Sequence, residues 1–241
     1  MARLQGKTAL ITGATGGQGR VACQTFAEEG AAVLATDLDA SAGAELERTL
    51  RDKGLDVTFV AANLSTTPGV QQLAEATGEC FDGLDILYAN HGIILGSPLL
   101  DTSEEEWDRI QDVNLKSVFL LTKHLAPQMA GRGASIINVS SIGALTVFPN
   151  LSAYGAAKAG LAMFSKCAAV DLAPLGIRVN AICPGVIDTP MPRSFIATLP
   201  DKPEAEVVMQ RSPTAPSWGA WAGPKRWSLS RCTSPATSPP S

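Results

Sequence analysis

Residues 8–20 have the sequence TALITGATGGQGR, a short apolar run followed by a turn with four glycines. The apolar run predicts a buried strand, and a helical pattern begins near Gly17. Glycines in such a turn let the backbone approach a pyrophosphate, whose charge is then held by amides at the start of the helix. The alternative is a plain tight turn, because glycine-rich turns are common.

Apolar runs of the same kind recur along the chain, at residues 32–36, 57–61, 85–89, 135–139 and 178–182. Further helical patterns begin near Ser41, Pro68, Ser103 and Ser152. Strands that are apolar on both faces and alternate with helices predict an α/β fold, a doubly wound parallel sheet with helices on both faces. Such sheets bind ligands beyond the carboxyl ends of their strands, so functional residues should follow the strands.

Composition excludes several classes of protein. The 241 residues are 45% hydrophobic and 17% charged, with a net charge of −4, which suits one globular core and predicts neither nucleic acid nor a membrane surface as a partner. Five scattered cysteines and two histidines predict no metal site and no disulfide framework. The sequence has no apolar stretch of about 20 residues and no signal peptide, which predicts a soluble, cytoplasmic protein.

Asp37 stands at the end of the second predicted strand, 24 residues after Gly13. An acid about 20 residues after the glycine motif hydrogen-bonds the ribose 2′-hydroxyl of NAD and repels the 2′-phosphate of NADP. The position therefore predicts NAD over NADP, unless Asp37 is a solvated residue that opens a turn.

Tyr154 and Lys158 lie four residues apart, on one face of a predicted helix. A nearby ammonium favours the phenolate and lowers the pKa of the phenol, which would allow general acid/base chemistry near neutral pH. Taken alone, such a pair is more often an ordinary pair on a helix surface.

In their order and spacing these motifs resemble the short-chain dehydrogenase/reductase family over residues 4–211. The family follows its glycine motif with an Asn-Ala-Gly-like turn, a helix Asn, a Ser and Tyr-x-x-x-Lys, here Asn90, Gly92, Asn114, Ser141, Tyr154 and Lys158. Ser141 lies thirteen residues before Tyr154, the usual gap. The segment from Pro184 to Thr189 matches the one that closes over the nicotinamide. The glycine motif fits two subgroups of the family: Gly13, Gly17 and Gly19 match the shorter subgroup, and Gly13, Gly16 and Gly19 match the extended one. The chain length favours the shorter subgroup.

The resemblance implies hydride transfer between a nicotinamide and a secondary alcohol or ketone. Tyr154 would exchange the substrate's hydroxyl proton, and Lys158 would hold the nicotinamide ribose and bias the tyrosine. Ser141 would bond the reacting oxygen, and Asn114 would maintain a helix kink and a water for proton relay. The implied cofactor contacts are Gly13, Thr15, Gly17, Gln18, Gly19, Asp37, Asn63, Leu64, Asn90, Gly92, Tyr154, Lys158, Pro184, Gly185, Ile187 and Thr189. The family also implies a homo-oligomer, if the C-terminus permits.

The chain departs from the family pattern at two places. Asn63-Leu64 replaces the common Asp-Val or Asp-Leu, which keeps an acceptor for adenine but loses a charge. His91 replaces a small residue in the Asn-x-Gly turn; it either titrates beside the cofactor or is a packed, neutral histidine, and the packed interpretation is favoured.

Substrate contacts are implied for a set of mainly apolar residues, for which ordinary packing is an equal alternative. They are Ile93, Ile94, Leu95, Ala144, Leu145, Phe148, Met191 and Phe195. Such a pocket would suit a hydrophobic secondary alcohol or ketone, although the sequence names neither the substrate nor the direction of reaction.

Residues 212–241 differ from the rest of the chain. Fifteen basic and 23 acidic residues precede Arg211, whereas four basic and no acidic residues follow from it. The family's next helix and final strand are absent, yet the codons of residues 217–241, shifted by one base, can encode LGRLGRPEEVVALALYLASDESSF, which matches that helix. We therefore expect an NAD-binding domain at 1–211 and an irregular, frameshifted tail at 212–241, with the last strand missing. A non-catalytic dinucleotide-binding or scaffold protein, or a poorly folding truncated product, is the second function class.

Overall fold

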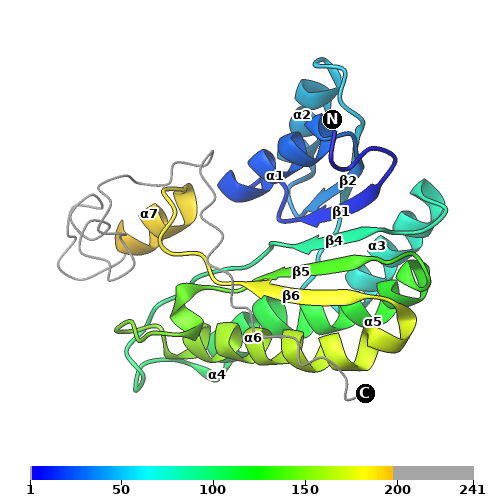
Figure 1. The fold of residues 1–241 in the computed structure, drawn as a ribbon. Helices are drawn as coiled ribbons and strands as arrows, with labels where there is room; N and C mark the ends of the chain where they lie inside the picture. Colours follow the sequence, from blue (N-terminus) through cyan, green and yellow to red (C-terminus); the bar gives the residue numbers. More distant parts are fainter. Residues whose placement is uncertain (1, 198–241) are drawn as a thin grey trace, which may run out of the picture.

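Six parallel strands form one sheet in the computed structural model, which describes residues 2–197 (Figure 1). The strands are β1 (Thr8–Thr12), β2 (Ala32–Asp37), β3 (Val57–Ala61), β4 (Ile86–Ala89), β5 (Ser135–Val139) and β6 (Arg178–Ile182). Their order across the sheet is β3-β2-β1-β4-β5-β6. The chain therefore runs outward from β1 to β3 and then crosses to the other side of β1, so the strand order reverses between β1 and β4. A ligand-binding crevice is expected beyond that reversal.

Helices cover both faces of the sheet, as predicted. They are α1 (Gly17–Glu28), α2 (Ala40–Arg51), α3 (Thr67–Cys80), α4 (Glu104–Gln111), α5 (Ser117–Met129), α6 (Ser152–Leu172) and α7 (Pro190–Ala197). One buried cluster joins the sheet to α3, α5 and α6, and a second joins the opposite face to α1 and α2, an arrangement that Figure 1 shows. The doubly wound α/β fold is confirmed.

The long helix predicted to begin near Ser103 is divided by a π-helical turn. Its start has a capping box, in which the Ser103 hydroxyl accepts from the Glu106 amide at 3.2 Å. After α4 the turn η1 (Asp112–Lys116) follows, and α5 continues from Ser117. Such turns occur mostly inside α-helices and at functional sites. Here the turn contains Asn114, the residue for which a helix kink was expected.

The candidate polar residues, such as Asp37 and Asn90, lie at the carboxyl ends of the strands or directly after them.

No helix within residues 2–197 is long and apolar enough to cross a membrane. The irregular tail expected at 212–241, the frameshift and the missing last strand lie outside the described residues, as does the expected boundary at residue 211.

Candidate active site

The glycine turn leaves β1 at the centre of the sheet and leads into α1. Gly13 has a φ of +63°, and a Cβ there would come within 2.8 Å of the His91 Cα, so this position requires glycine. A Cβ on Gly19 would overlap the Gly13 carbonyl oxygen, because α1 starts directly against the turn. The glycines at 13 and 19 therefore let α1 begin directly against the turn, on the side of the sheet where the crevice is expected.

Asp37 ends β2 beside the glycine turn and is oriented by Thr15. One carboxylate oxygen accepts from the Thr15 hydroxyl at 2.6 Å and from the Thr15 amide at 2.9 Å. The other oxygen accepts from the Leu38 amide at 2.7 Å. The carboxylate is thus fixed at the edge where the sequence placed it, rather than free in solvent.

The two residues after β3 differ in what they can offer a ligand. The Asn63 side-chain oxygen accepts from both the amide and the hydroxyl of Ser65, at 3.1 and 2.7 Å, so its hydrogen bonds are made within the local turn. Leu64 is buried in the main core cluster. The acceptor expected at Asn63 for adenine is therefore already occupied, and Leu64 can contribute through its backbone alone.

Asn90 joins the loop after β4 to the end of β1. Its side-chain amide donates to the carbonyl oxygens of Thr12 and Gly13, each at 3.3 Å, and its backbone amide donates to the Thr12 hydroxyl at 3.0 Å. This bridge spans the point where the strand order reverses. It holds the glycine turn against the loop that contains Gly92.

Tyr154 and Ser141 meet at the carboxyl end of β5. The Ser141 hydroxyl oxygen accepts from the Gly143 amide at 3.0 Å, which leaves its proton to donate. Burial raises the pKa of the Tyr154 phenol, and a hydrogen bond with Ser141 opposes that rise. The lowering of this pKa by the Lys158 cation, expected from the sequence, is not seen: burial is the largest influence, and the phenol is protonated at neutral pH.

Lys158 lies one turn beyond Tyr154 on α6 and is 4% exposed. Its ammonium is 5.9 Å from the Tyr154 ring centroid and donates to the Val139 carbonyl oxygen at 2.9 Å. Burial lowers the pKa of Lys158 to about 8. The pair is therefore not an ordinary surface pair, because the lysine points into the protein beneath the tyrosine.

Asn114 is fully buried within the π-helical turn. Its side-chain oxygen accepts from the Ile93 amide and its side-chain nitrogen donates to the Ile93 carbonyl oxygen, both at 3.0 Å. The turn is thereby bound to the loop after β4. A Cβ on Gly92, in that loop, would lie 2.6 Å from the Asn114 oxygen and 3.3 Å from the Lys158 nitrogen. Asn114, Gly92 and Lys158 therefore form one packed group.

The segment after β6 closes over the glycine turn. The Pro184 carbonyl oxygen accepts from the Ile142 amide at 2.9 Å, which ties the start of this segment to the turn after Ser141. Thr189 is buried, and its methyl group packs against the Gly17 backbone. Gly185 and Ile187 lie between these two attachment points, so the cofactor residues expected here are gathered with the others.

An apolar hollow of about 560 Å³ opens beside Tyr154. Its walls are Leu99 and residues 143–152 and 154–156, which include the predicted contacts Ala144, Leu145 and Phe148. No charged side chain lines it. Ile93 and Leu95 do not line this hollow, and both pack against a small core cluster around Ile110.

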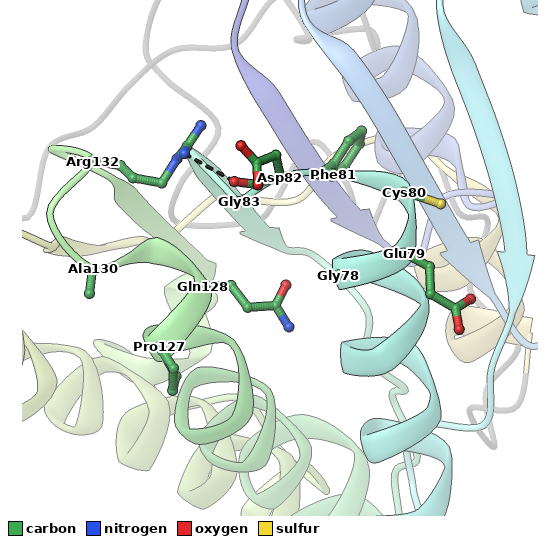
Figure 2. Close-up of a pocket in the computed structure, with 10 residues that line it drawn as sticks. All are labelled: Gly78, Glu79, Cys80, Phe81, Asp82, Gly83, Pro127, Gln128, Ala130 and Arg132. Carbon is green, nitrogen blue, oxygen red and sulfur yellow. Dashed lines mark hydrogen bonds between the residues drawn. The ribbon is translucent and has the colours of Figure 1, made fainter.

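A second hollow, of about 640 Å³, lies where β4 and β5 begin, at the edge of the sheet opposite to Tyr154 (Figure 2). It is bordered by the ends of α3 and α5, and Arg132 donates across it to the Asp82 carbonyl oxygen at 3.3 Å. None of the predicted functional residues lines this hollow. Within residues 2–197 no three His, Cys, Asp or Glu side chains gather to hold a metal ion.

The chain's residues fit a dinucleotide at the reversal point of the sheet. Helix α1 begins at Gly17 directly after the glycine turn, and the first amides of a helix have no partner within it, so they can hold a pyrophosphate. Asp37 is oriented by Thr15 at the position expected for contact with a ribose hydroxyl. The side-chain oxygen of Gln18 is buried without a partner, which is expected of a group that completes its hydrogen bonds with a ligand.

The fold and this edge of the sheet define a Rossmann-type dinucleotide-binding protein. Residues 7–199 match the model of the short chain dehydrogenase family, and the chain belongs to that family.

Relatives of known name agree with this assignment. Cyclopentanol dehydrogenase from Comamonas testosteroni is 38% identical over 197 residues, 81% of this chain and 79% of the relative. The structure of actinorhodin polyketide ketoreductase with NADPH matches at 29% identity with a TM-score of 0.84, covering 93% of this chain and 88% of that one. NAD⁺-bound xylitol dehydrogenase matches at 30% identity with a TM-score of 0.73, covering 77% and 72%. Both forms of the dinucleotide thus occur among similar structures.

Sequence patterns did not predict Leu99 or Ser117 as parts of this region, whereas two residues of α7, Met191 and Phe195, were expected there. Leu99 reaches the apolar hollow from a loop about 45 residues before the other wall, and no periodic pattern marks such a loop. The expected kink at Asn114 was the one signal that could have directed attention to Ser117.

Proposed function

We propose that this protein is an NAD-dependent dehydrogenase or reductase of a hydrophobic secondary alcohol or ketone, with Tyr154 as the general acid/base. The observation that carries the proposal is the position of the Tyr154 phenol at the wall of the apolar hollow, beside the Ser141 hydroxyl and above the buried Lys158. The nicotinamide, when bound, supplies the hydride acceptor or donor.

The chain's own residues would handle the proton and the reacting oxygen. In alcohol oxidation the substrate O–H proton passes to the Tyr154 phenolate while the carbinol hydride leaves, and in ketone reduction the phenol returns that proton. Ser141 has its hydroxyl proton available and donates it to the reacting oxygen, which orients the substrate. Lys158 places a positive charge near the phenolate, and Asn114 anchors the loop that packs against that lysine.

The substrate class follows from the walls of the hollow. Ala144, Leu145 and Phe148 present apolar surface, and charged side chains are absent from the lining. A charged substrate would lose its hydration there without a compensating partner. We infer a neutral alcohol or ketone with a compact hydrocarbon body.

NAD is proposed over NADP because the carboxylate of Asp37, at the end of β2, would repel a 2′-phosphate. Its carboxylate is held by Thr15 and the Leu38 amide, so it cannot readily turn away from a second negative charge. The lost charge at Asn63 affects the adenine end and leaves this preference unchanged. A cytoplasmic location and a homo-oligomer stay predictions from the sequence.

The test is the appearance or loss of reduced-nicotinamide absorbance with a panel of neutral cyclic and linear secondary alcohols, their ketones, and matched carboxylated analogues. Turnover with neutral members and NAD, lost in Tyr154→Phe, supports the proposal. Turnover restricted to the carboxylated analogues contradicts the substrate class. Thermal melting with and without NAD separates a catalyst from a protein that fails to fold or to bind, since specific binding raises the midpoint.

A further inference from the structure

His91 lies between the glycine turn and the π-helical turn, and both of its ring nitrogens are in close contact with hydroxyl groups. Nδ1 is 2.6 Å from the Thr12 hydroxyl oxygen, and Nε2 is 2.7 Å from the Ser117 hydroxyl oxygen. Thr12 and Ser117 are themselves fully buried, at 0% and 1% exposure. Every proton in this group must therefore be directed to a partner inside the protein.

The hydrogen-bond count determines the protonation of the ring. The Ser117 hydroxyl donates its single proton to the Val113 carbonyl oxygen at 2.7 Å, so toward His91 it can only accept. Nε2 must then carry a proton. The Thr12 oxygen already accepts from the amides of Asn90 and His91, at 3.0 and 3.2 Å, so it donates its own proton to Nδ1.

Only one state satisfies all of these bonds: a neutral imidazole with its proton on Nε2. A second proton, on Nδ1, would face a Thr12 oxygen whose two lone pairs are in use. Burial, followed by the positive charge of Lys158, lowers the pKa of His91 to about 3, while the charge of Asp37 acts weakly in the opposite direction. The packed, neutral interpretation of this histidine agrees with that direction.

The ring connects two segments that also meet at a second point. Its Nε2–H donates to Ser117, at the end of the π-helical turn, and Asn114 in that turn makes its paired hydrogen bonds with Ile93. The loop from His91 to Ile93 is thus joined to the turn on both sides of Gly92, whose backbone packs against Asn114 and Lys158. A displacement of the turn would move Asn114 and, through Ile93, the loop whose Gly92 packs against Lys158.

We propose that His91 is a positioning residue: as the neutral Nε2–H tautomer it holds the π-helical turn to the end of β1 and thereby sets the placement of Asn114 and of the loop that packs against Lys158. The inference rests on the proposed roles of those two residues. A small side chain at position 91 would leave the Ser117 oxygen and the Thr12 proton without these partners. The turn would then be free to shift by a fraction of an ångström, and misplacement of about 1 Å can cost on the order of 100-fold in rate.

Three substitutions separate the two halves of the bridge. In His91→Gln the amide nitrogen reaches the place of Nε2 and can still donate to Ser117, whereas in His91→Asn the shorter amide reaches only the place of Nδ1. His91→Ala removes both bonds. We expect kcat to fall about 10-fold or more in the Ala and Asn variants and to be largely restored in Gln, with KM for NAD within about 2-fold throughout. Equal kcat in all variants, or losses that follow the melting temperature alone, would overturn the proposal.

Ser117→Ala tests the same bond from its other end. If His91 acts through Ser117, the double variant His91→Ala/Ser117→Ala loses no more kcat than the more affected single variant. Losses that multiply would mean that the two residues act independently, and the proposal fails.

The tautomer is measured without turnover. The chain has two histidines, so ¹⁵N NMR of the unliganded protein, with His124→Gln to assign the second ring, reports His91 directly. We expect Nε2 protonated and Nδ1 unprotonated at neutral pH. A protonated Nδ1 overturns the proposal, whatever the activity. Retained turnover in Tyr154→Phe would instead refute the proposed function, so the two failures are distinguishable.

Discussion

The Thr15 hydroxyl donates a 2.6 Å hydrogen bond to the carboxylate of Asp37. This bond joins the glycine turn to the end of β2, and the Thr15 amide strengthens it with a second bond of 2.9 Å to the same oxygen. A negative charge is thereby fixed next to the backbone that is proposed to cradle a pyrophosphate. Discrimination between dinucleotides then depends on repulsion as well as attraction.

Asp37→Ser should relax the proposed preference for NAD. Removal of the fixed charge lifts a like-charge repulsion that costs several kcal/mol, so the ratio of kcat/KM with NADP to kcat/KM with NAD should rise on the order of 100-fold. Steady-state kinetics with both dinucleotides measure it. Thr15→Val is the control. It keeps the Asp37 charge but removes the hydroxyl that orients the carboxylate, so it should shift the ratio less. An unchanged ratio in Asp37→Ser would contradict the assignment.

Tyr154→Phe should abolish turnover and leave NAD binding nearly intact. The substitution keeps the ring and removes the hydroxyl that exchanges the proton, a loss on the order of 10³-fold. Calorimetric titration with NAD and single-turnover absorbance separate binding from chemistry. Tyr88→Phe is the matched control, because Tyr88 is the chain's other tyrosine and packs against Phe26 between the sheet and α1. Turnover that survives in Tyr154→Phe rules out the proposed acid/base.

The pH profile should report the raised pKa of Tyr154. Because burial keeps the phenol protonated at neutral pH, alcohol oxidation, which needs the phenolate, should accelerate as the pH rises. The hydrogen bond with Ser141 lowers this pKa, so Ser141→Ala should move the rising limb of log(kcat/KM) to higher pH. A limb that stays in place, or moves to lower pH, would show that another group controls it.

The sequence predicted the sheet well because buried parallel strands are continuous apolar runs, and β1, β3, β5 and β6 begin and end at the expected residues. Contacts between residues on different elements were harder to predict. The π-helical turn occupies only five residues inside a longer helical pattern, so the break between α4 and α5 followed only from the resemblance at Asn114. Spacing placed Lys158 beside Tyr154, but its bond to Val139, on a different element, cannot be derived from spacing.

Asp85 should make stability depend on acid pH. It is buried at the start of β4, and although burial raises the pKa of its carboxyl, hydrogen bonds from Thr8 and Lys7 outweigh this and hold the pKa below its ordinary value. A lowered folded pKa stabilises the protein above the unfolded pKa of about 3.9, and this contribution is lost as the pH falls through the folded value.

Asp85→Asn should therefore lower the melting temperature most at neutral pH, with a loss of about 1–3 kcal/mol, and the difference from wild type should shrink toward pH 3. Thermal melts across that range test it. Asp82→Asn, at an exposed neighbouring position, is the control and should have little effect. A destabilisation that is constant with pH would mean that packing, rather than charge, explains the role of Asp85.

Lys158→Met should abolish turnover while stabilising the protein. The buried ammonium has a pKa of about 8 instead of 10.5, so below pH 8 the folded state bears the full cost of its charge, roughly 3 kcal/mol, and stability rises as the pH climbs from 8 to 10.5. Methionine removes that cost and loses the bond to Val139, worth about 1 kcal/mol, which leaves a net gain on the order of 2 kcal/mol at pH 7. Thermal melts should show this gain shrink above pH 8.

Lys166→Met, at an exposed position on the same helix, should change neither turnover nor melting. A loss of stability in Lys158→Met at pH 7 would mean that its hydrogen bond outweighs the cost of burying its charge.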